Sequence, residues 1–544
     1  NVTLTDANAL TLGSISAGSL AVTTGAGGNV NGALTQSGAL TLTGTSSFTN
    51  NSVSVTSANK AITLNNASND FGNQAVSLNA GGAVSITDNN STGLNVGTVN
   101  AGSFTATGLN ITQNDAITTT GGAVTLNAAG DFSQDANGSI TAGSGSTWGD
   151  VTIHAGTGTG VGTGAVSLAG LVEGNKLTID TGANSTGDIT QSGNLISHST
   201  DTVQDSIYVR NYGTGDVVQT ATGSITLTDS TSRNIGTALI ADHGNIVQAG
   251  TVDAKQSTVT LKSLNGSYIT QDDGMGHLGN ITAGYLEIYG QSGGSVSLTG
   301  ANSLSNVQGH NLGDVSISNI STSDLVFGDF TASGNFTLDA FQDVSQAAST
   351  NINVGGITDI NAQGNDITFA NSGNNFAGAV SLTGGNIQFT QSGDLALDQV
   401  FGQGDILIIA ENGTLSFGTN QPIQNSNGDV TLVADHFTNN YAGSDAIDIN
   451  NGRWLFYLNN YDGNTLGNLS ASPVWSTAYP ASVSSGGNHY VYNIENPNPF
   501  TETPVAADPG VVTNSISNSI KQFFPRWKGK GKLKNNIVGN NNSQ

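Results

Sequence analysis

The feature that most constrains the fold of this chain is a series of short runs in which apolar and polar residues alternate. Residues Gly378–Leu397 (GAVSLTGGNIQFTQSGDLAL) hold three such runs, which start seven or eight residues apart. Strict alternation predicts strands with one buried face, and the glycine-rich breaks predict tight bends. The spacing leaves no room for a crossover helix, so a chain that bends the same way each time closes into a coil. We therefore predict an all-β fold, a parallel β-helix.

Variants of this pattern recur through most of the chain, at Asn1–Leu20, Ala83–Phe104 and Asp314–Phe336. A second marker is a glutamine after a short apolar run, at Gln36, Gln113, Gln134, Gln191, Gln219, Gln248, Gln271, Gln346 and Gln391. The short gaps between these glutamines are 21 to 29 residues, which is the imperfect period of a solenoid. With ~440 residues at ~20–29 per coil, we expect ~15–22 coils and, at ~4.8 Å per coil, a rod ~70–105 Å long.

The composition fits a stack of hydrogen-bonded coils. Charged residues make up 9% of the chain, against ~25% in ordinary globular domains, and Gly, Ser, Thr and Asn take their place. We expect hydroxyl and amide side chains to face water and to stack in rows. All eight prolines lie at or after Pro422. Because proline lacks the N–H that a strand ladder needs, we expect the architecture to change from about that residue.

Charge and cysteine usage exclude several classes of function. The net charge is −25, and residues 521–534 carry six of the thirteen Lys and Arg, so the body is strongly acidic and unsuited to nucleic acid. The chain has no cysteine, hence no disulfides and no thiolate metal sites, and we expect no cofactor. No apolar run approaches the ~20 residues of a membrane helix. Asn1 starts in mid-repeat, and we expect a piece of a longer protein that lacks its N-terminal portion.

We expect three parts: a rod over residues 1–437, a capping region over 438–495, and a tail over 496–544. Trp454, Tyr457 and Trp475 belong to a dense group of aromatic residues that we expect to close the open end of the coil stack. The tail begins with a proline-rich linker. A short helix with apolar residues at helical spacing and a basic end follows it; these candidate anchoring residues are Ile516, Ile520, Phe523 and Phe524. This helix either docks on a partner or an anionic membrane surface, or folds back on the cap.

Two places in the rod carry candidate contact residues. Tyr208, Arg210 and Tyr212 alternate on one side of an expected strand, which suits a protein or glycan contact surface. The alternative is that the tyrosines cover a neighbouring insertion. Trp148 is either a loop aromatic that covers a coil edge or a ligand-stacking residue.

The rival to a non-enzymatic rod is a polysaccharide-binding or polysaccharide-degrading β-helix. Cleavage of polyuronates needs paired carboxylates or a basic residue at the site. The expected coils hold two arginines, Arg210 and Arg233, and four widely spread lysines. Most aspartates sit beside Gly or Asn, as turn residues do, and His243 and His277 have no recognisable partners. Binding to a crystal surface by threonine rows is a third possibility, but Thr3, Thr11, Thr41 and Thr226 do not recur at a fixed interval.

The repeats also resemble those of a known family. Asn69–Leu78 (NDFGNQAVSL) and Asn374–Asn386 (NNFAGAVSLTGGN) resemble repeats of large exoproteins of the filamentous haemagglutinin type. Gly452–Tyr457 (GRWLFY) and Tyr479–Tyr492 are similar to a segment near the C-terminus of many such proteins. The resemblance covers nearly the whole chain, and the GRWLFY segment is its most specific part.

The resemblance implies a right-handed β-helix that is secreted to a Gram-negative cell surface through an outer-membrane transporter of the two-partner type. Such proteins act as adhesins or extracellular filaments. A host or bacterial receptor or glycan and self-association into fibres are the partners that it implies. Some relatives anchor through a C-terminal cysteine pair, which this chain lacks. No toxin domain follows the rod, which argues against a contact-dependent inhibition protein. We expect a structural and adhesive rod with no catalytic residues.

Overall fold

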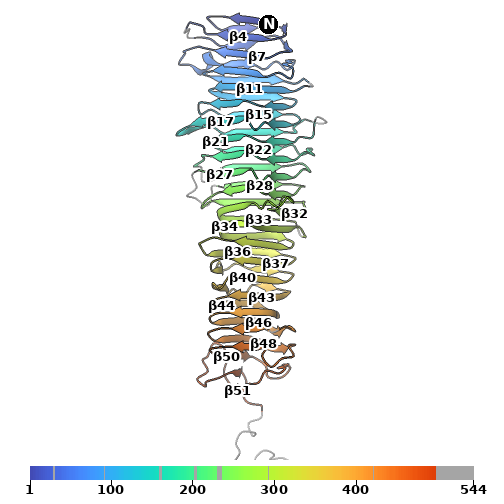
Figure 1. Cartoon of the computed structure of the whole chain (residues 1–544), viewed down its shortest axis with the longest axis vertical. Helices are drawn as coiled ribbons and strands as arrows, with labels where there is room; N and C mark the ends of the chain where they lie inside the picture. The colour runs from blue at the N-terminus through green and yellow to red at the C-terminus, as the bar shows by residue number, and fades with distance from the viewer. Residues whose placement is uncertain are drawn as a thin grey trace, which may run out of the picture. The chain divides into compact units, whose positions relative to one another are not determined.

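The computed structural model divides the chain into two compact units, Asn1–Ile494 and Glu495–Gln544. It describes residues 1–27, 31–90, 92–158, 162–200, 205–228, 236–291, 293–420 and 422–497. The first unit is a parallel β-solenoid of about 19 turns (Figure 1), which confirms the predicted fold class and lies within the predicted number of coils. At ~4.8 Å per turn, about 19 stacked turns extend for ~90 Å.

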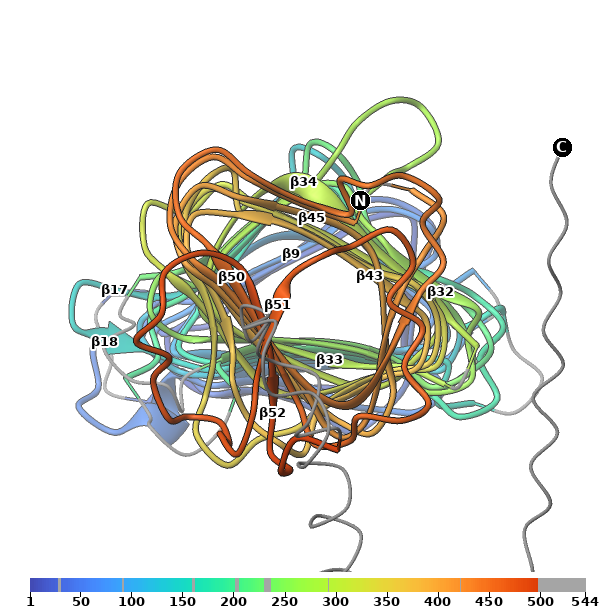
Figure 2. The ribbon, with the colours of Figure 1, turned by 90° about the horizontal axis from the view of Figure 1, so that it is seen from below.

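The strands stack in three columns around the axis of this unit, and neighbours within a column pair in parallel (Figures 1 and 2). Column 1 holds β2 (Leu10–Leu12), β5 (Leu34–Gln36), β8 (Ile62–Leu64), β10 (Ala83–Asp88), β12 (Ser103–Gly108), β15 (Val124–Ala128), β19 (Val151–Ala155), β22 (Leu177–Thr181), β25 (Ile207–Asn211), β28 (Gly236–Ala241), β31 (Thr258–Ser263), β33 (Asn280–Tyr289), β34 (Ser295–Leu312), β36 (Leu325–Ala332), β38 (Val344–Gln346), β41 (Ile367–Phe369), β44 (Ile387–Ser392), β46 (Ile406–Phe417), β48 (Val430–Asn439), β50 (Trp454–Leu458) and β52 (His489–Tyr492).

Column 2 holds β1 (Val2–Thr5), β4 (Leu20–Thr24), β7 (Ser46–Asn50), β9 (Val76–Ala80), β11 (Leu94–Ala101), β13 (Ile111–Gln113), β16 (Phe132–Gln134), β20 (Val166–Leu168), β23 (Ile189–Gln191), β26 (Val217–Gln219), β29 (Ile246–Gln248), β32 (Tyr268–Thr270), the start of β34, β35 (Val315–Asn319), β37 (Phe336–Ala340), β40 (Thr358–Asn361), β43 (Ala379–Gly384), β45 (Leu395–Gly402), β47 (Ile423–Asn425) and β49 (Ile447–Ile449).

Column 3 is built from shorter strands and from parts of long ones such as β33, β34 and β46. Its separate strands are β3 (Ile15–Ala17), β6 (Leu40–Leu42), β14 (Ala116–Thr119), β17 (Ser139–Ser144), β21 (Leu171–Gly174), β24 (Asn194–Ser197), β27 (Ser224–Leu227), β30 (Thr251–Asp253), β39 (Ile352–Val354) and β42 (Asn375–Phe376). Outside the columns, β18 (Thr147–Trp148) forms an antiparallel hairpin with β17, and β51 (Ser472–Val474) pairs with β52. A 3₁₀ turn spans Ser57–Lys60. No helix in these described ranges is long and apolar enough to cross a membrane.

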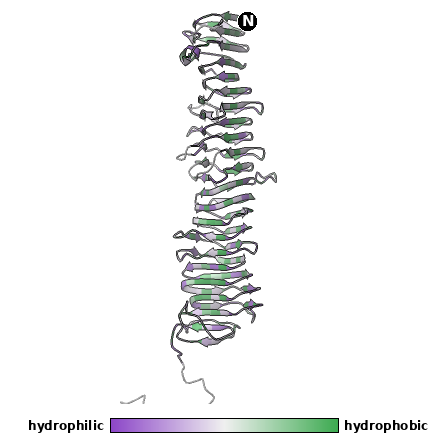
Figure 3. Ribbon diagram, turned by 90° about the vertical axis from the view of Figure 1, so that its left-hand side faces the viewer, coloured by the Kyte–Doolittle hydropathy of each residue, from purple (hydrophilic) through white to green (hydrophobic). Residues whose placement is uncertain are grey.

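The core lies inside the coil because alternate residues of each strand point inward. In β22, Leu177, Ile179 and Thr181 are buried while the residues between them are half-buried. Hydrophobic and hydrophilic residues occur together along the strands of the solenoid unit (Figure 3). The inward side chains of successive turns stack on one another, and each fully buried aliphatic side chain contributes ~1.5–3 kcal/mol. In the C-terminal half, phenylalanine rings form a chain of contacts within the core; they are Phe327, Phe330, Phe336, Phe369, Phe376 and Phe389.

Six of the nine glutamine markers, those from Gln113 to Gln271, form a buried row in column 2, which corrects the expectation that amides face water. Gln113, Gln191 and Gln248 end column 2 strands in the same register, and each is at most 4% exposed. Along this row the Nε2 group donates to a backbone carbonyl of the next turn; for Gln219 the acceptor is Thr251 O at 3.2 Å. Turning the amide inward satisfies backbone carbonyls where the chain bends between columns 2 and 3. Hydroxyl rows do lie outside, as where the Thr11 and Thr35 hydroxyls meet at 2.8 Å.

A second row, of aspartate and asparagine, runs along a corner of the coil. Asp366 Oδ1 accepts from the Asn386 N–H at 2.8 Å, and Asn386 Oδ1 accepts from the Asp405 N–H at 2.8 Å. Asp405 Oδ1 in turn accepts from the Asp429 N–H at 2.9 Å. Each of these side chains therefore binds the backbone of the following turn, which explains why the turns are rich in aspartate.

The coil does not change architecture at Pro422. This residue precedes β47, which pairs in parallel with both β45 and β49, and its carbonyl accepts from the Val400 N–H at 2.7 Å. A proline is tolerated at the first position before a strand because its missing N–H is not needed there. The predicted boundary at residue 437 falls inside β48, and parallel pairing continues through β50 to β52.

Candidate functional site

The structure brings the predicted contact residues together on the outside of the coil: Tyr208 and Arg210 lie on β25, and Tyr212 directly follows it. Arg210 donates to both carboxylate oxygens of Asp242 at 3.0 and 2.9 Å, and to the Tyr208 hydroxyl at 3.0 Å. The guanidinium lies 4.1 Å from the centre of the Tyr212 ring. The hydrogen bonds to Asp242 are the main reason that the pKa of Arg210 is raised, and burial raises that of Tyr212. The donors of Arg210 are thus largely engaged within the rod.

Two pairs of stacked aromatic rings lie on other turns of the coil. Trp148, on the β17–β18 hairpin, stacks on the His198 ring with 3.8 Å between centroids, and the His198 Nε2 lies 2.8 Å from Glu173. Trp148 therefore covers the side of the coil. Tyr289 stacks on His310 in the next turn at 4.9 Å.

The predicted capping residues Trp454, Tyr457 and Trp475 lie at the end of the solenoid unit, but they do not form one cluster. Trp454 points into the coil and meets Tyr490 edge-on at 5.1 Å. Trp475 stacks on Tyr492 at 4.8 Å and contacts Tyr461 at 5.2 Å. Tyr457 points outward, and its hydroxyl donates to Ala481 O at 2.7 Å.

Residues 475–488 fold back over the outer face of β50, and we call this segment the flap. Val483 of the flap packs with Leu455 and Tyr457 in a small cluster separate from the main core. Arg453 holds the flap in place, because its guanidinium donates to Ser485 O at 2.6 Å and to Val483 O at 3.0 Å. The flap leaves Leu455 and Tyr457 only 7% and 6% exposed.

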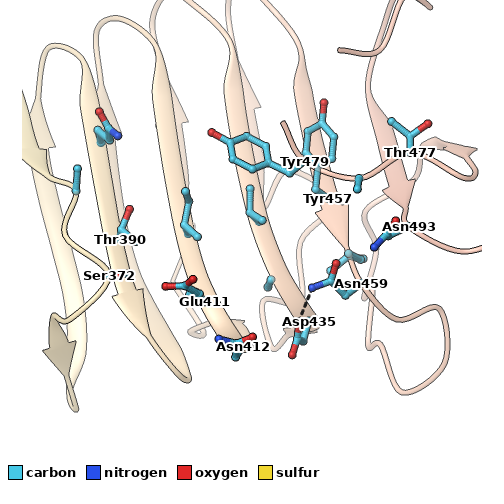
Figure 4. A pocket seen from close by; sticks show the side chains of 18 residues that line it. Ser372, Thr390, Glu411, Asn412, Asp435, Tyr457, Asn459, Thr477, Tyr479 and Asn493 are labelled. Carbon is cyan, nitrogen blue, oxygen red and sulfur yellow. Dashed lines mark hydrogen bonds between the residues drawn. The ribbon is translucent and has the colours of Figure 1, made fainter. Parts of the chain in front are cut away.

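An open groove lies beside the flap, across the outer faces of β44, β46, β48 and β50 (Figure 4). Its volume is about 490 Å³, and a second hollow of about 630 Å³ adjoins it. Tyr479 of the flap and Gln388 of β44 line both hollows. Tyr479 is 38% exposed and meets Tyr457 edge-on at 5.4 Å. We call the two hollows together the flap groove.

A bulge places two polar side chains at the rim of the flap groove. The register of β46 and β48 shifts between Ala410 and Thr414, so that three residues of β46 face one residue of β48. Glu411 and Asn412 lie in this bulge, and Asn412 has φ of 57°, in the left-handed region that asparagine tolerates. Across the rim, Asn459 donates to Asp435 at 2.6 Å (Figure 4). This site is not among the predictions from the sequence; its local signal there is the Glu-Asn-Gly at residues 411–413, which interrupts an alternating run.

The other candidates raised by the sequence do not assemble into a site. His277 does have a partner, since its Nδ1 lies 2.7 Å from Asp273 within a single turn, and this contact lowers the pKa of Asp273. Thr3 pairs with Ala21 and Thr226 with Ile196 and Asp253, so these threonines do not share a row. No group of three or more His, Cys, Asp or Glu residues in the described ranges is placed to hold a metal ion. Ile516, Ile520, Phe523 and Phe524 lie outside the described residues, as does the expected C-terminal helix.

Comparison with known proteins gives one similarity. A family described as "Repeats of unknown function (DUF5649)" matches residues 1–79, 81–133 and 312–383. Both repeats that resemble filamentous haemagglutinin repeats, at 69–78 and 374–386, overlap these segments. No curated protein and no solved structure matches the chain. The similarity supports a repeat protein and carries no activity.

Proposed function

We propose that this chain is a non-enzymatic structural and adhesive rod of an exported bacterial surface protein. The observation that carries the proposal is the continuous parallel ladder from β2 to β52, in which inward residues fill the core and corner residues bind the backbone of the next turn. A stack of this kind uses its aspartates to hold one turn on another. Asp366 and Asp405 are examples, since each accepts a backbone N–H from the following turn.

The proposed location and export route rest on the resemblance stated above. The segment Gly452–Tyr457, which is the most specific part of the resemblance, contains most of β50, and the segment Tyr479–Tyr492 contains part of the flap and β52. We infer export through an outer-membrane transporter of the two-partner type to a Gram-negative cell surface. The small share of charged residues, with hydroxyl and amide side chains in their place, also supports self-association into fibres.

Three measurements test this proposal. Deleting residues 1–497 from the protein of its native host should reduce attachment of cells to surfaces; unchanged attachment would refute an adhesive role. Deleting the transporter of that host should leave the protein inside the cell, and continued secretion would overturn the export route. Electron microscopy of purified material distinguishes fibres from single rods, and monodisperse single rods would count against self-association.

Under this proposal the chain does not cleave polysaccharides. A separate assay tests this expectation. Purified protein is incubated with a panel of neutral and acidic polysaccharides, and reducing and unsaturated sugar ends are measured. We expect no release above that of heat-unfolded protein. Release of new ends by the folded protein would overturn the non-enzymatic assignment.

A further inference from the structure

The outer face of the last turns differs in character from that of the turns before it. On β12, β15, β19 and β22, the central outward residues are threonines in register, such as Thr125 and Thr152. On β46 and β48 several outward positions are apolar instead, since Leu407, Ile409 and Val433 are half-buried there. An apolar strip on the outer face of a coil needs a cover or a ligand.

The flap covers only part of this strip. It buries Leu455 and Tyr457 and reaches Val433, which packs at the edge of the same cluster. Leu407 and Ile409 lie farther along and form part of the floor of the flap groove. The strip therefore continues beyond the flap into an open groove that has an aromatic wall.

The wall and rim of the flap groove have the chemistry that carbohydrates require. Tyr479 offers a partly exposed ring, and its neighbour Tyr457 is fixed by the hydrogen bond to Ala481. Sugar rings present an apolar C–H face that packs on aromatic rings and hydroxyl groups that bind carboxylates and amides. Opposite the tyrosines, Glu411, Asn412 and Asn459 supply such groups (Figure 4). No other described residue has a hydrogen bond or ion pair to the Glu411 side chain.

The charges of the residues that line the flap groove limit the class of sugar that it can bind. The residues that line the two hollows include Glu411, Asp405, Asp429 and Asp435, and no Lys, Arg or His lines either hollow in the described part of the chain. Arg453 lies 3.7 Å from Asp429, but in the described part of the chain no basic residue forms an ion pair with Glu411, Asp405 or Asp435. Such unpaired carboxylates repel uronates, sulfated glycans and phosphates. The polar residues along the rim come from successive turns, ~4.8 Å apart, a step comparable to the length of one sugar ring.

We propose that the flap groove binds a neutral oligosaccharide, with a sugar face on Tyr479 and the Ile409 floor and its hydroxyls on Glu411, Asn412 and Asn459. This inference rests on the proposed adhesive role and gives it a ligand class. Its test is binding in solution, which does not depend on export or on cell attachment, so the two proposals fail separately. A lysine-rich peptide is the rival occupant, because it would match the carboxylates without using the tyrosine.

The experiment titrates the full chain by isothermal calorimetry with hexasaccharides of β-1,4-glucose, β-1,4-xylose, β-1,4-mannose, α-1,4-glucose and β-1,3-glucose. Hexagalacturonate and a hexalysine peptide are the comparison probes. We expect at least one neutral hexasaccharide to bind, and hexagalacturonate not to bind. Binding of hexalysine alone, or of no neutral sugar, would overturn the proposal.

Substitutions locate the site. Tyr479→Ala should weaken binding by about tenfold, the effect expected from loss of one aromatic contact. Glu411→Gln removes a charge from an exposed side chain and should weaken binding by a few fold without affecting folding. The matched control is Tyr268→Ala, since Tyr268 is 37% exposed and lies far from the groove on β32. If Glu411→Gln and Tyr479→Ala both bind like Tyr268→Ala, the flap groove is not the site.

Discussion

Gln248 Nε2 donates to Gln219 Oε1 at 2.9 Å across two successive turns, with both side chains buried inside the coil. Gln248 also accepts from Gln271 Nε2 at 2.7 Å, so three consecutive turns are joined by their side-chain amides. The same Gln248 Nε2 reaches Gly250 O at 2.6 Å, which fixes the bend that follows β29. The row therefore joins turn to turn and also sets where each turn bends.

Replacing the side-chain amide of Gln248 should lower the free energy of unfolding substantially, even when the substitution keeps the volume of the side chain. Gln248→Leu keeps the volume but leaves Gln219 Oε1 without its donor and Gln271 Nε2 without one acceptor. Each unsatisfied buried group costs ~1–3 kcal/mol, so we expect a loss of about 2–5 kcal/mol in urea unfolding. Val247→Thr, one residue away on the outer face, is the control and should change stability by less than about 1 kcal/mol. Equal effects of the two substitutions would show that the amide row contributes nothing specific.

The strands and their stacking were predictable because both depend on local sequence. Alternation at Val380 and Leu382 gives the buried face of β43, and the glycine-rich break after them gives the bend. The buried position of the glutamines was also present in the pattern. In β13, Gln113 is two residues after the buried Ile111, so it has the inward parity of a strand. Because the core of a protein is expected to be apolar, the inward parity of the glutamines did not lead to the prediction that they are buried.

The flap groove was not predictable from the sequence for a different reason. It needs Tyr479 to lie beside Gln388 and Ile409, which are 70 or more residues earlier. No periodic pattern encodes that contact, because the chain leaves the strand ladder to form the flap and rejoins it at β52. The aromatic density near the end of the coil indicated a cap, but it did not indicate that Tyr457 faces outward.

Asp88 should make stability depend on pH. It is fully buried in β10, and burial raises its pKa from 3.8 to about 6, although its carboxylate accepts the Phe71 and Asn90 N–H groups. Because the folded state holds the proton more tightly than the unfolded state, the stability that this proton contributes is complete below about pH 4. It is lost as pH rises through about 6.

Asp88→Asn removes this titration, so the stability of the wild type relative to the variant should fall between pH 4 and 7. The fall should be at most about 3 kcal/mol, since one pKa unit corresponds to ~1.4 kcal/mol. Urea midpoints measured across this range test it. Asp314→Asn is the control, since its outer-corner position is taken by Asn335 in the next turn, where the side chain likewise accepts a backbone N–H. Parallel pH profiles for wild type and Asp88→Asn would contradict the prediction.

Arg210 and Asp242 should be coupled in stability. Arg210 and Asp242 form a bidentate ion pair that is partly shielded from solvent, with side chains 26% and 16% exposed. Arg210→Lys keeps the charge but loses the second hydrogen bond, and we expect a loss of about 0.5–1 kcal/mol. Asp242→Asn should cost a similar amount, and the double variant should cost less than the sum of the two. Strict additivity in a thermal denaturation cycle would mean that the pair contributes no net stability and that Arg210 is free for another role.

Trp475 should hold the last turns of the solenoid in place. Its ring stacks on Tyr492 of β52 and contacts Tyr461, so it joins the start of the flap to the final strand. Trp475→Ala removes a large, partly buried ring, and we expect about 2 kcal/mol of local destabilisation, or roughly 30-fold faster hydrogen exchange in β50 and β52. Trp148→Ala is the matched control, because Trp148 also stacks on one neighbour, His198, but lies on a side hairpin. Exchange in β52 that is equal in the two variants would show that Trp475 does not cap the coil, and that the main-chain pairing of β50 with β52 is sufficient to close it.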